Sequence, residues 1–191
     1  TFAAEEGVSL DEDLTPRMSS LDLAAMNQSG KPVTLRGLLS HTNGASVSGF
    51  PGYPPAESLP SNLQVIQGAD ITNTDAIAFL PIEEGERRYS GGGYQVAQAW
   101  AEEASGEAFD DLMKRLVLDP IGMTASTFAQ PLSSELASGN VAEAYNGGGE
   151  MVEGGWHVYP EQAAAGLWTT PSDYARFMLA LIGAADGNAS L

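Results

Sequence analysis

Cysteine is absent from this chain of 191 residues, which excludes disulfides, thiolate metal sites and a cysteine nucleophile. Basic side chains are scarce, since 8 lysines and arginines stand against 25 acidic residues, for a formal net charge of −17. Binding to nucleic acids or to anionic membranes needs clustered positive charge, so the composition argues against both. No apolar run has the length of a membrane span, and no transmembrane segment is expected.

What is present fits a globular protein, because 43% of the residues are hydrophobic and the length suffices for one domain with a core. Residues 1–7 read as the tail of a helix that we expect to begin upstream of Thr1, with Gly7 as its C-terminal cap. We expect two parts: a helix tail plus acidic connector over residues 1–33, and a helical domain over residues 34–191. The predicted fold class is mainly α, with long loops and few short strands.

Each expected helix is predicted from an apolar stripe at helical spacing, from a capping residue, or from a residue that stops a helix. A long irregular stretch is expected over residues 45–72, and a flexible hairpin or loop tip at Gly147–Gly149. The predicted helices are Thr34 (N-cap) to Gly44, Asp75 to Leu80 before Pro81, Tyr94 to Ala104 before Gly106, Phe109 to Val117 before Pro120, and Thr170 (N-cap) with Pro171 to Gly183.

The most informative segment is Tyr89-Ser90-Gly91-Gly92-Gly93-Tyr94, because three consecutive glycines suit neither a helix interior nor a strand. The glycines predict an open turn with an accessible phenol. Two interpretations of Tyr89 follow from the residues alone. It could simply pack beside a glycine turn, or it could transfer protons if a neighbouring positive charge lowered its pKa from about 10.

Four segments in this order resemble the serine β-lactamase-like family, which includes class C β-lactamases, D-alanyl-D-alanine carboxypeptidases and esterase relatives. They are Leu38–Gly44, Tyr89–Tyr94, Pro120–Met123 and Ala163–Thr170. The resemblance implies the helical domain of an α/β serine hydrolase. It also implies acyl-enzyme chemistry on a β-lactam, a D-Ala peptide or an ester, no metal or organic cofactor, and a periplasmic or cell-envelope location.

The resemblance makes Tyr89 the catalytic proton-transfer residue and implies that Ser90, Gly91, Trp156 and Tyr159 bind substrate. Ser90 falls on the middle position of the family's Tyr-x-Asn element, and Gly91 replaces its asparagine, which puts efficient β-lactam turnover in doubt. The family's Ser-x-x-Lys nucleophile is missing, because no serine here is followed three residues later by lysine. We expect it upstream of Thr1, and a Lys-Thr-Gly-type element downstream of Leu191.

This 191-residue chain is therefore predicted to be inactive alone, and to associate with a missing α/β half or with itself. The alternative is a non-catalytic helical interaction module, or one half of a two-chain assembly. The two histidines, His41 and His157, are interpreted mainly as a helix cap and a packed loop residue. Asp11-Glu12-Asp13 lacks the spacing of a calcium loop, so no metal site is expected there.

Overall fold

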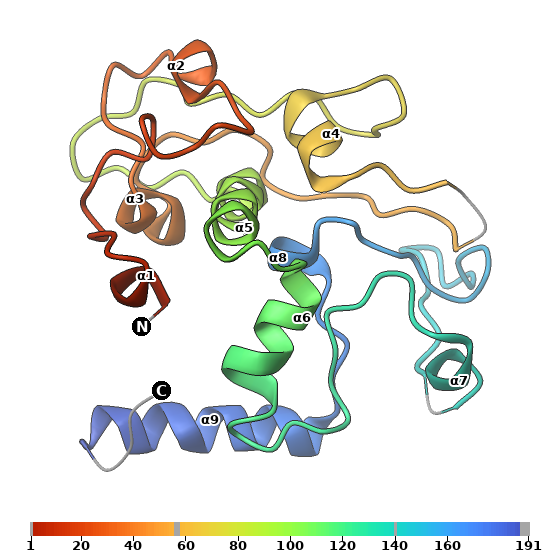
Figure 1. Ribbon diagram of the computed structural model, residues 1–191. Helices are drawn as coiled ribbons and strands as arrows, with labels where there is room; N and C mark the ends of the chain where they lie inside the picture. Colours follow the sequence, from red (N-terminus) through yellow and green to blue (C-terminus); the bar gives the residue numbers. More distant parts are fainter. Residues whose placement is uncertain (1, 56–57, 140, 188–191) are drawn as a thin grey trace.

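The computed structural model describes residues 2–55, 58–139 and 141–187, and shows short helices joined by long loops (Figure 1). The mainly helical fold predicted from the sequence is confirmed. In place of the expected short strands, the described residues show isolated bridges such as Tyr53 with Val158. The elements are α1 (Phe2–Glu5), α2 (Leu23–Met26), α3 (Leu35–Ser40), α4 (Asn62–Gln67), α5 (Gly91–Ser105), α6 (Phe109–Met113), η1 (Lys114–Leu118), α7 (Ser134–Ala137), α8 (Gln162–Ala165) and α9 (Pro171–Ala185).

Helix α5 lies at the centre, and α3, α4 and α8 pack around it (Figure 1). The main core joins α5 to side chains of the N-terminal connector and of α3, α4 and residues 77–79, all of them nearly inaccessible to water. Burying each large apolar side chain contributes about 1.5–3 kcal/mol. The core takes residues from both sides of residue 33, and the two-part division at that point stays a prediction. Its members include Leu14, Leu23, Val33, Leu38, Ile66, Phe79, Val96 and Trp100.

A carboxylate at the end of α5 ties that helix to the connector. Glu103 accepts hydrogen bonds from the backbone N–H and the hydroxyl of both Ser19 and Ser20, over 2.6–3.1 Å. Burial by itself would raise the pKa of Glu103, but these four hydrogen bonds outweigh it and lower the pKa to about 2. The central helix is thereby fixed against the loop that precedes α2.

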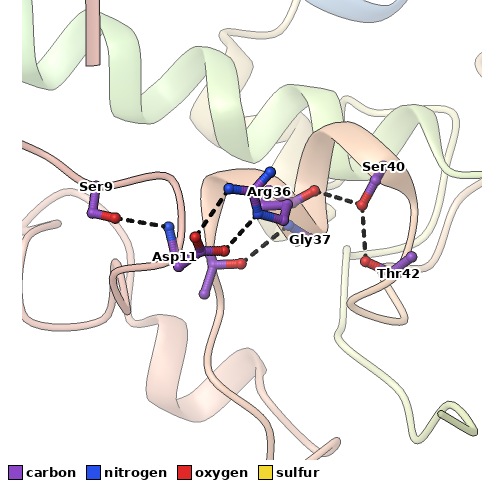
Figure 2. A network of polar contacts seen from close by, with 7 residues as sticks. Ser9, Asp11, Arg36, Gly37, Ser40 and Thr42 are labelled. Carbon is purple, nitrogen blue, oxygen red and sulfur yellow. Dashed lines mark hydrogen bonds and ion pairs between the residues drawn. The ribbon is translucent and has the colours of Figure 1, made fainter. Parts of the chain in front are cut away.

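Helix α3 begins where the sequence predicts, because the Thr34 side chain accepts a hydrogen bond from the N–H of Gly37. An ion pair joins α3 to the N-terminal connector: Arg36 binds both carboxylate oxygens of Asp11, at 2.6 and 3.0 Å (Figure 2). The predicted end at Gly44 is wrong. The helix ends at Ser40, because His41 adopts a left-handed conformation with φ of 63°.

The predicted helix Asp75–Leu80 is also wrong, since this segment is extended. Phe79 bridges both Asn27 and Ala45, and its own N–H donates to the carbonyl of Met26. Pairing with two distant segments overrides the local helical pattern. Conversely, α4 lies in the stretch expected to be irregular, where Ser61 and Gln64 form a capping box.

The remaining predicted helices are present with shifted ends. Helix α5 begins at Gly91, three residues before the predicted start, and ends at Gly106 as expected. The stripe predicted over Phe109–Val117 forms α6 followed by a π-helical turn that runs to Leu118. The glycine-rich tip is confirmed as a hairpin turn, because Tyr145 and Met151 pair across it.

Helix α9 is capped by Thr170 and starts at Pro171 as predicted, and it continues past Gly183 to Ala185. It lies below α6, away from the core around α5 (Figure 1). Asp173 is its one buried residue, and it accepts hydrogen bonds from the N–H of Ala125 and the hydroxyl of Ser126. Within the described ranges, none of the helices has the length and hydrophobicity of a transmembrane segment.

Candidate active site

Tyr89 stands immediately before the first turn of α5, and 71% of its surface is exposed. The next residue, Ser90, is the N-cap: its backbone is extended and its hydroxyl accepts the N–H of Gly93 at 3.0 Å. The chain therefore turns sharply from an extended segment into the central helix. This turn presents the phenol to solvent at a fixed point of the fold, as the sequence predicts for an accessible tyrosine.

The Ser90–Gly92 turn is anchored on residues 46–48, a segment that contains a strained residue. The hydroxyl of Ser90 donates to the carbonyl of Ser46 at 2.6 Å, and the N–H groups of Gly91 and Gly92 donate to the carbonyls of Ser48 and Val47. Val47 adopts φ of 61°, a conformation that a β-branched residue rarely takes. Such strain persists only where surrounding contacts enforce it, and it is frequent at functional sites.

Two of the three glycines, Gly91 and Gly92, are required for packing, and the row begins a helix, which corrects the expectation that it forms an open turn. A Cβ on Gly92 would lie 2.4 Å from the carbonyl oxygen of Ser46. A Cβ on Gly91 would lie 2.9 Å from the Phe50 ring. These glycines let the first turn of α5 approach the Ser46–Phe50 segment directly, and both are buried.

An open groove of about 790 Å³ borders the same strained segment. The groove is lined by residues 46–49 and by residues 72–76 with Ala78 and Leu80. Ser46 and Val47 thus accept hydrogen bonds from the turn at Ser90–Gly92 and are also among the residues that line the groove. The groove therefore borders the segment that anchors the turn, and Tyr89 itself is not among the residues that line it.

His41 contacts the tyrosine segment directly. Its Nδ1 accepts the N–H of Ser90 at 3.2 Å. Its ring centroid lies 4.7 Å from that of Tyr89 and 5.5 Å from that of Tyr94. His41 is the C-cap of α3 as predicted, but it caps through its backbone N–H, and its ring Nδ1 binds Ser90 instead of an α3 carbonyl. The contacts with Tyr89 come from the tertiary structure alone.

The predicted substrate-binding residues fall into two groups. Ser90 and Gly91 adjoin Tyr89, but both are buried, and the Ser90 hydroxyl is engaged with Ser46. Trp156 packs edge-to-face on Trp168. Tyr159 packs against the loop at Pro51 and Gly52, and its hydroxyl lies 3.5 Å from the Pro51 carbonyl oxygen. In the part of the chain that the structure describes, no hydrogen bond or ring contact joins Tyr89 to either aromatic residue. Substrate binding by these four stays a prediction.

His157 is a packed loop residue as predicted, with its Nδ1 2.8 Å from the Pro51 carbonyl. The acidic run is engaged with local partners: Asp11 with Arg36, Glu12 with Arg17, and Asp13 with the backbone and hydroxyl of Thr15. The described residues contain no group of three or more histidines and carboxylates arranged to hold a metal ion.

Sequence reasoning missed one titratable group. Glu161 is fully buried, and neither carboxylate oxygen has a hydrogen-bond partner among the described residues. Burial raises its pKa to about 7. Burial, with a further contribution from Glu161, also raises the pKa of Tyr159. The sequence neighbours of Glu161, Pro160 and Gln162, give no signal of its burial, because a glutamate before a short helix is normally exposed.

A family model for beta-lactamase matches residues 2–191. The chain therefore belongs to the beta-lactamase family, and the resemblance seen in its motifs is confirmed. No curated protein sequence matches the chain.

Solved structures of this fold are similar to the chain. D-amino acid amidase from Ochrobactrum anthropi SV3 superposes with a TM-score of 0.70 at 23% identity, over 97% of this chain and 50% of that one. The octameric penicillin-binding protein homologue from Pyrococcus abyssi gives 0.65 at 23%, over 99% and 43%. A class C beta-lactamase gives 0.60 at 22%, over 99% and 47%. The chain thus spans about half the length of these relatives.

Proposed function

We propose that this chain is the tyrosine-bearing portion of a serine hydrolase that acts by acyl-enzyme transfer. The observation that carries the proposal is the exposed phenol of Tyr89 on a doubly anchored turn beside a groove. A serine outside residues 1–191 attacks the substrate carbonyl, Tyr89 relays the proton, and water hydrolyses the acyl-enzyme. Substrates are β-lactams, D-Ala peptides or esters, bound with help from Ser90, Gly91, Trp156 and Tyr159.

The same proposal holds that the 191-residue chain alone is inactive, because no Ser-x-x-Lys sequence occurs in it. Intact mass spectrometry before and after treatment with a penicillin and with a fluorophosphonate tests this. We expect the calculated mass without an adduct. An adduct on the 191-residue chain would reveal a reactive serine within it and overturn the proposal. Residence in the periplasm or cell envelope is a further part of the proposal, and fractionation of cells tests it.

The role of Tyr89 is tested in a longer protein that contains a Ser-x-x-Lys segment before these residues. There, Tyr89→Phe should lower kcat about 10²–10⁴-fold, the usual contribution of a positioned acid or base. Tyr94→Phe is the matched control, because Tyr94 also contacts His41 but its hydroxyl donates to the Leu39 carbonyl. Equal losses in both variants would argue against a specific proton-transfer role of the Tyr89 hydroxyl.

A second candidate is a non-catalytic interaction module or one half of a two-chain assembly, and the surface of α9 favours it. Five large apolar side chains of this helix are exposed: Tyr174, Met178, Leu179, Leu181 and Ile182. A patch of this kind marks an interaction surface. An α/β half of the enzyme or a second copy of the chain would cover it, and the octameric state of the Pyrococcus abyssi relative is consistent with self-association.

The two candidate functions predict different results when a polypeptide that carries the nucleophile is added to the chain. Under the hydrolase proposal, a polypeptide that supplies Ser-x-x-Lys forms a complex that a penicillin or fluorophosphonate acylates. Under the module proposal, complexes form but no acylation appears. The coding sequence on either side of residues 1–191 gives an independent test, since a Ser-x-x-Lys directly before Thr1 favours the hydrolase.

A further inference from the structure

We propose that His41 is a positioning residue that fixes Tyr89 in place. The inference rests on the proposed function of Tyr89 and concerns how its phenol is held. The side chain is 71% exposed, and so would otherwise sample several rotamers. A proton-transfer group must be held close to one geometry for efficient reaction. The contacts around Tyr89 show what supplies that restraint.

His41 binds the chain on both sides of Tyr89. Its carbonyl accepts the N–H of Arg88 at 2.9 Å, and its Nδ1 accepts the N–H of Ser90 at 3.2 Å. Its ring meets the phenol ring itself, at 4.7 Å between centroids. One residue thus holds the residue before Tyr89, the residue after it and its side chain.

The unusual backbone of His41 makes this arrangement possible. With φ of 63°, the residue ends α3 and turns toward the segment that precedes α5. Because Nδ1 of His41 accepts this hydrogen bond, that nitrogen carries a lone pair and no proton. Asparagine tolerates the left-handed conformation and offers an oxygen at a similar place, whereas glycine tolerates the conformation and offers no acceptor. The two substitutions therefore separate the acceptor from the backbone geometry.

The experiment compares His41→Gly and His41→Asn with the unmodified 191-residue chain by NMR. Amide hydrogen exchange of Ser90 should accelerate on the order of tenfold in His41→Gly, since one hydrogen bond is lost, and stay within about twofold in His41→Asn. The ring resonances of Tyr89 should shift in both variants, because both lose the imidazole. His157→Asn is the matched control and should change neither signal.

Two results would overturn the proposal. Equal Ser90 exchange in the Asn and Gly variants would show that the Nδ1 contact is not the restraint. Unchanged Tyr89 resonances in both variants would show that the imidazole does not hold the phenol. Thermal unfolding of each variant checks that the fold is intact. None of these NMR measurements depends on catalysis. The hydrolase proposal could therefore fail in the acylation experiment without changing the outcome of this one.

Discussion

The hydroxyl of Ser90 lies 2.6 Å from the carbonyl oxygen of Ser46 and also accepts the N–H of Gly93. One side chain therefore caps the central helix and joins it to the strained segment that borders the groove. This double use explains why a serine, buried to 1% exposure, precedes the glycines. It also makes Ser90 the first position at which to test the construction of the site.

Ser90→Ala should reduce the free energy of unfolding by about 2 kcal/mol, because a buried cap is lost and the Ser46 carbonyl loses its donor. Ser133→Ala is the matched control: Ser133 caps α7 but is exposed, so its loss should cost about 0.5 kcal/mol. Urea unfolding of both variants measures the difference. Equal costs would contradict the anchoring role of Ser90.

Gly92→Ala and Gly93→Ala should differ in sign although they are neighbours in one helical turn. A methyl on Gly92 would meet the Ser46 carbonyl oxygen at 2.4 Å, so the backbone must shift, at a cost of about 2–3 kcal/mol. A methyl on Gly93 would meet the Ala45 methyl at an ordinary 3.5 Å and should stabilise by about 0.5–1 kcal/mol. Thermal and urea unfolding check both. Comparable stabilities would mean that the close approach at Gly92 is absent.

Glu161 should make the protein less stable as the pH rises. Its pKa is about 7 in the folded chain and near 4.5 when unfolded, so the folded state binds the proton more tightly. Its contribution to stability is fully present below pH 4.5 and is lost as the pH rises through 7, by about 3 kcal/mol at most.

Glu161→Gln removes this titration and keeps the shape of the side chain. The variant should therefore be more stable than the unmodified chain at pH 8, with the advantage shrinking toward pH 5. Glu153→Gln, at an exposed position, is the control and should show no such trend. The measurement is urea unfolding from pH 5 to 8. A variant that is less stable at pH 8 would mean that the carboxylate is charged and partnered.

The exposed apolar face of α9 predicts that the isolated chain self-associates. Leu179 is 68% exposed and Ile182 55%, so Leu179→Lys or Ile182→Lys should weaken association at least about tenfold. Leu10→Lys is the control, since Leu10 is an exposed leucine of the connector, outside α9. Sedimentation velocity over a concentration series gives the dissociation constants. A chain that stays monomeric at all concentrations would refute the prediction.

Local signals in the sequence determined where several helices begin or end. Thr34 and Thr170 cap helices as predicted, and Gly106 ends α5, because caps depend on a few neighbouring residues. The capping box at Ser61 and Gln64 was equally local, yet the surrounding prolines favoured a loop. The four motif segments between Leu38 and Thr170 also sufficed to indicate the family, since their residue types and order are visible without any structure.

Distant contacts decided the rest. Residues 75–80 are extended because Phe79 pairs with Asn27 and Ala45, and the local pattern carries no trace of those partners. Glycine is needed at position 92 because the Ser46 carbonyl occupies the space that a side chain would take. The sequence by itself determined the N-caps at Thr34 and Thr170, the C-cap at Gly106, and the family. Only the tertiary structure brought His41 against Tyr89, because a contact across 48 residues depends on how α3 and α5 pack.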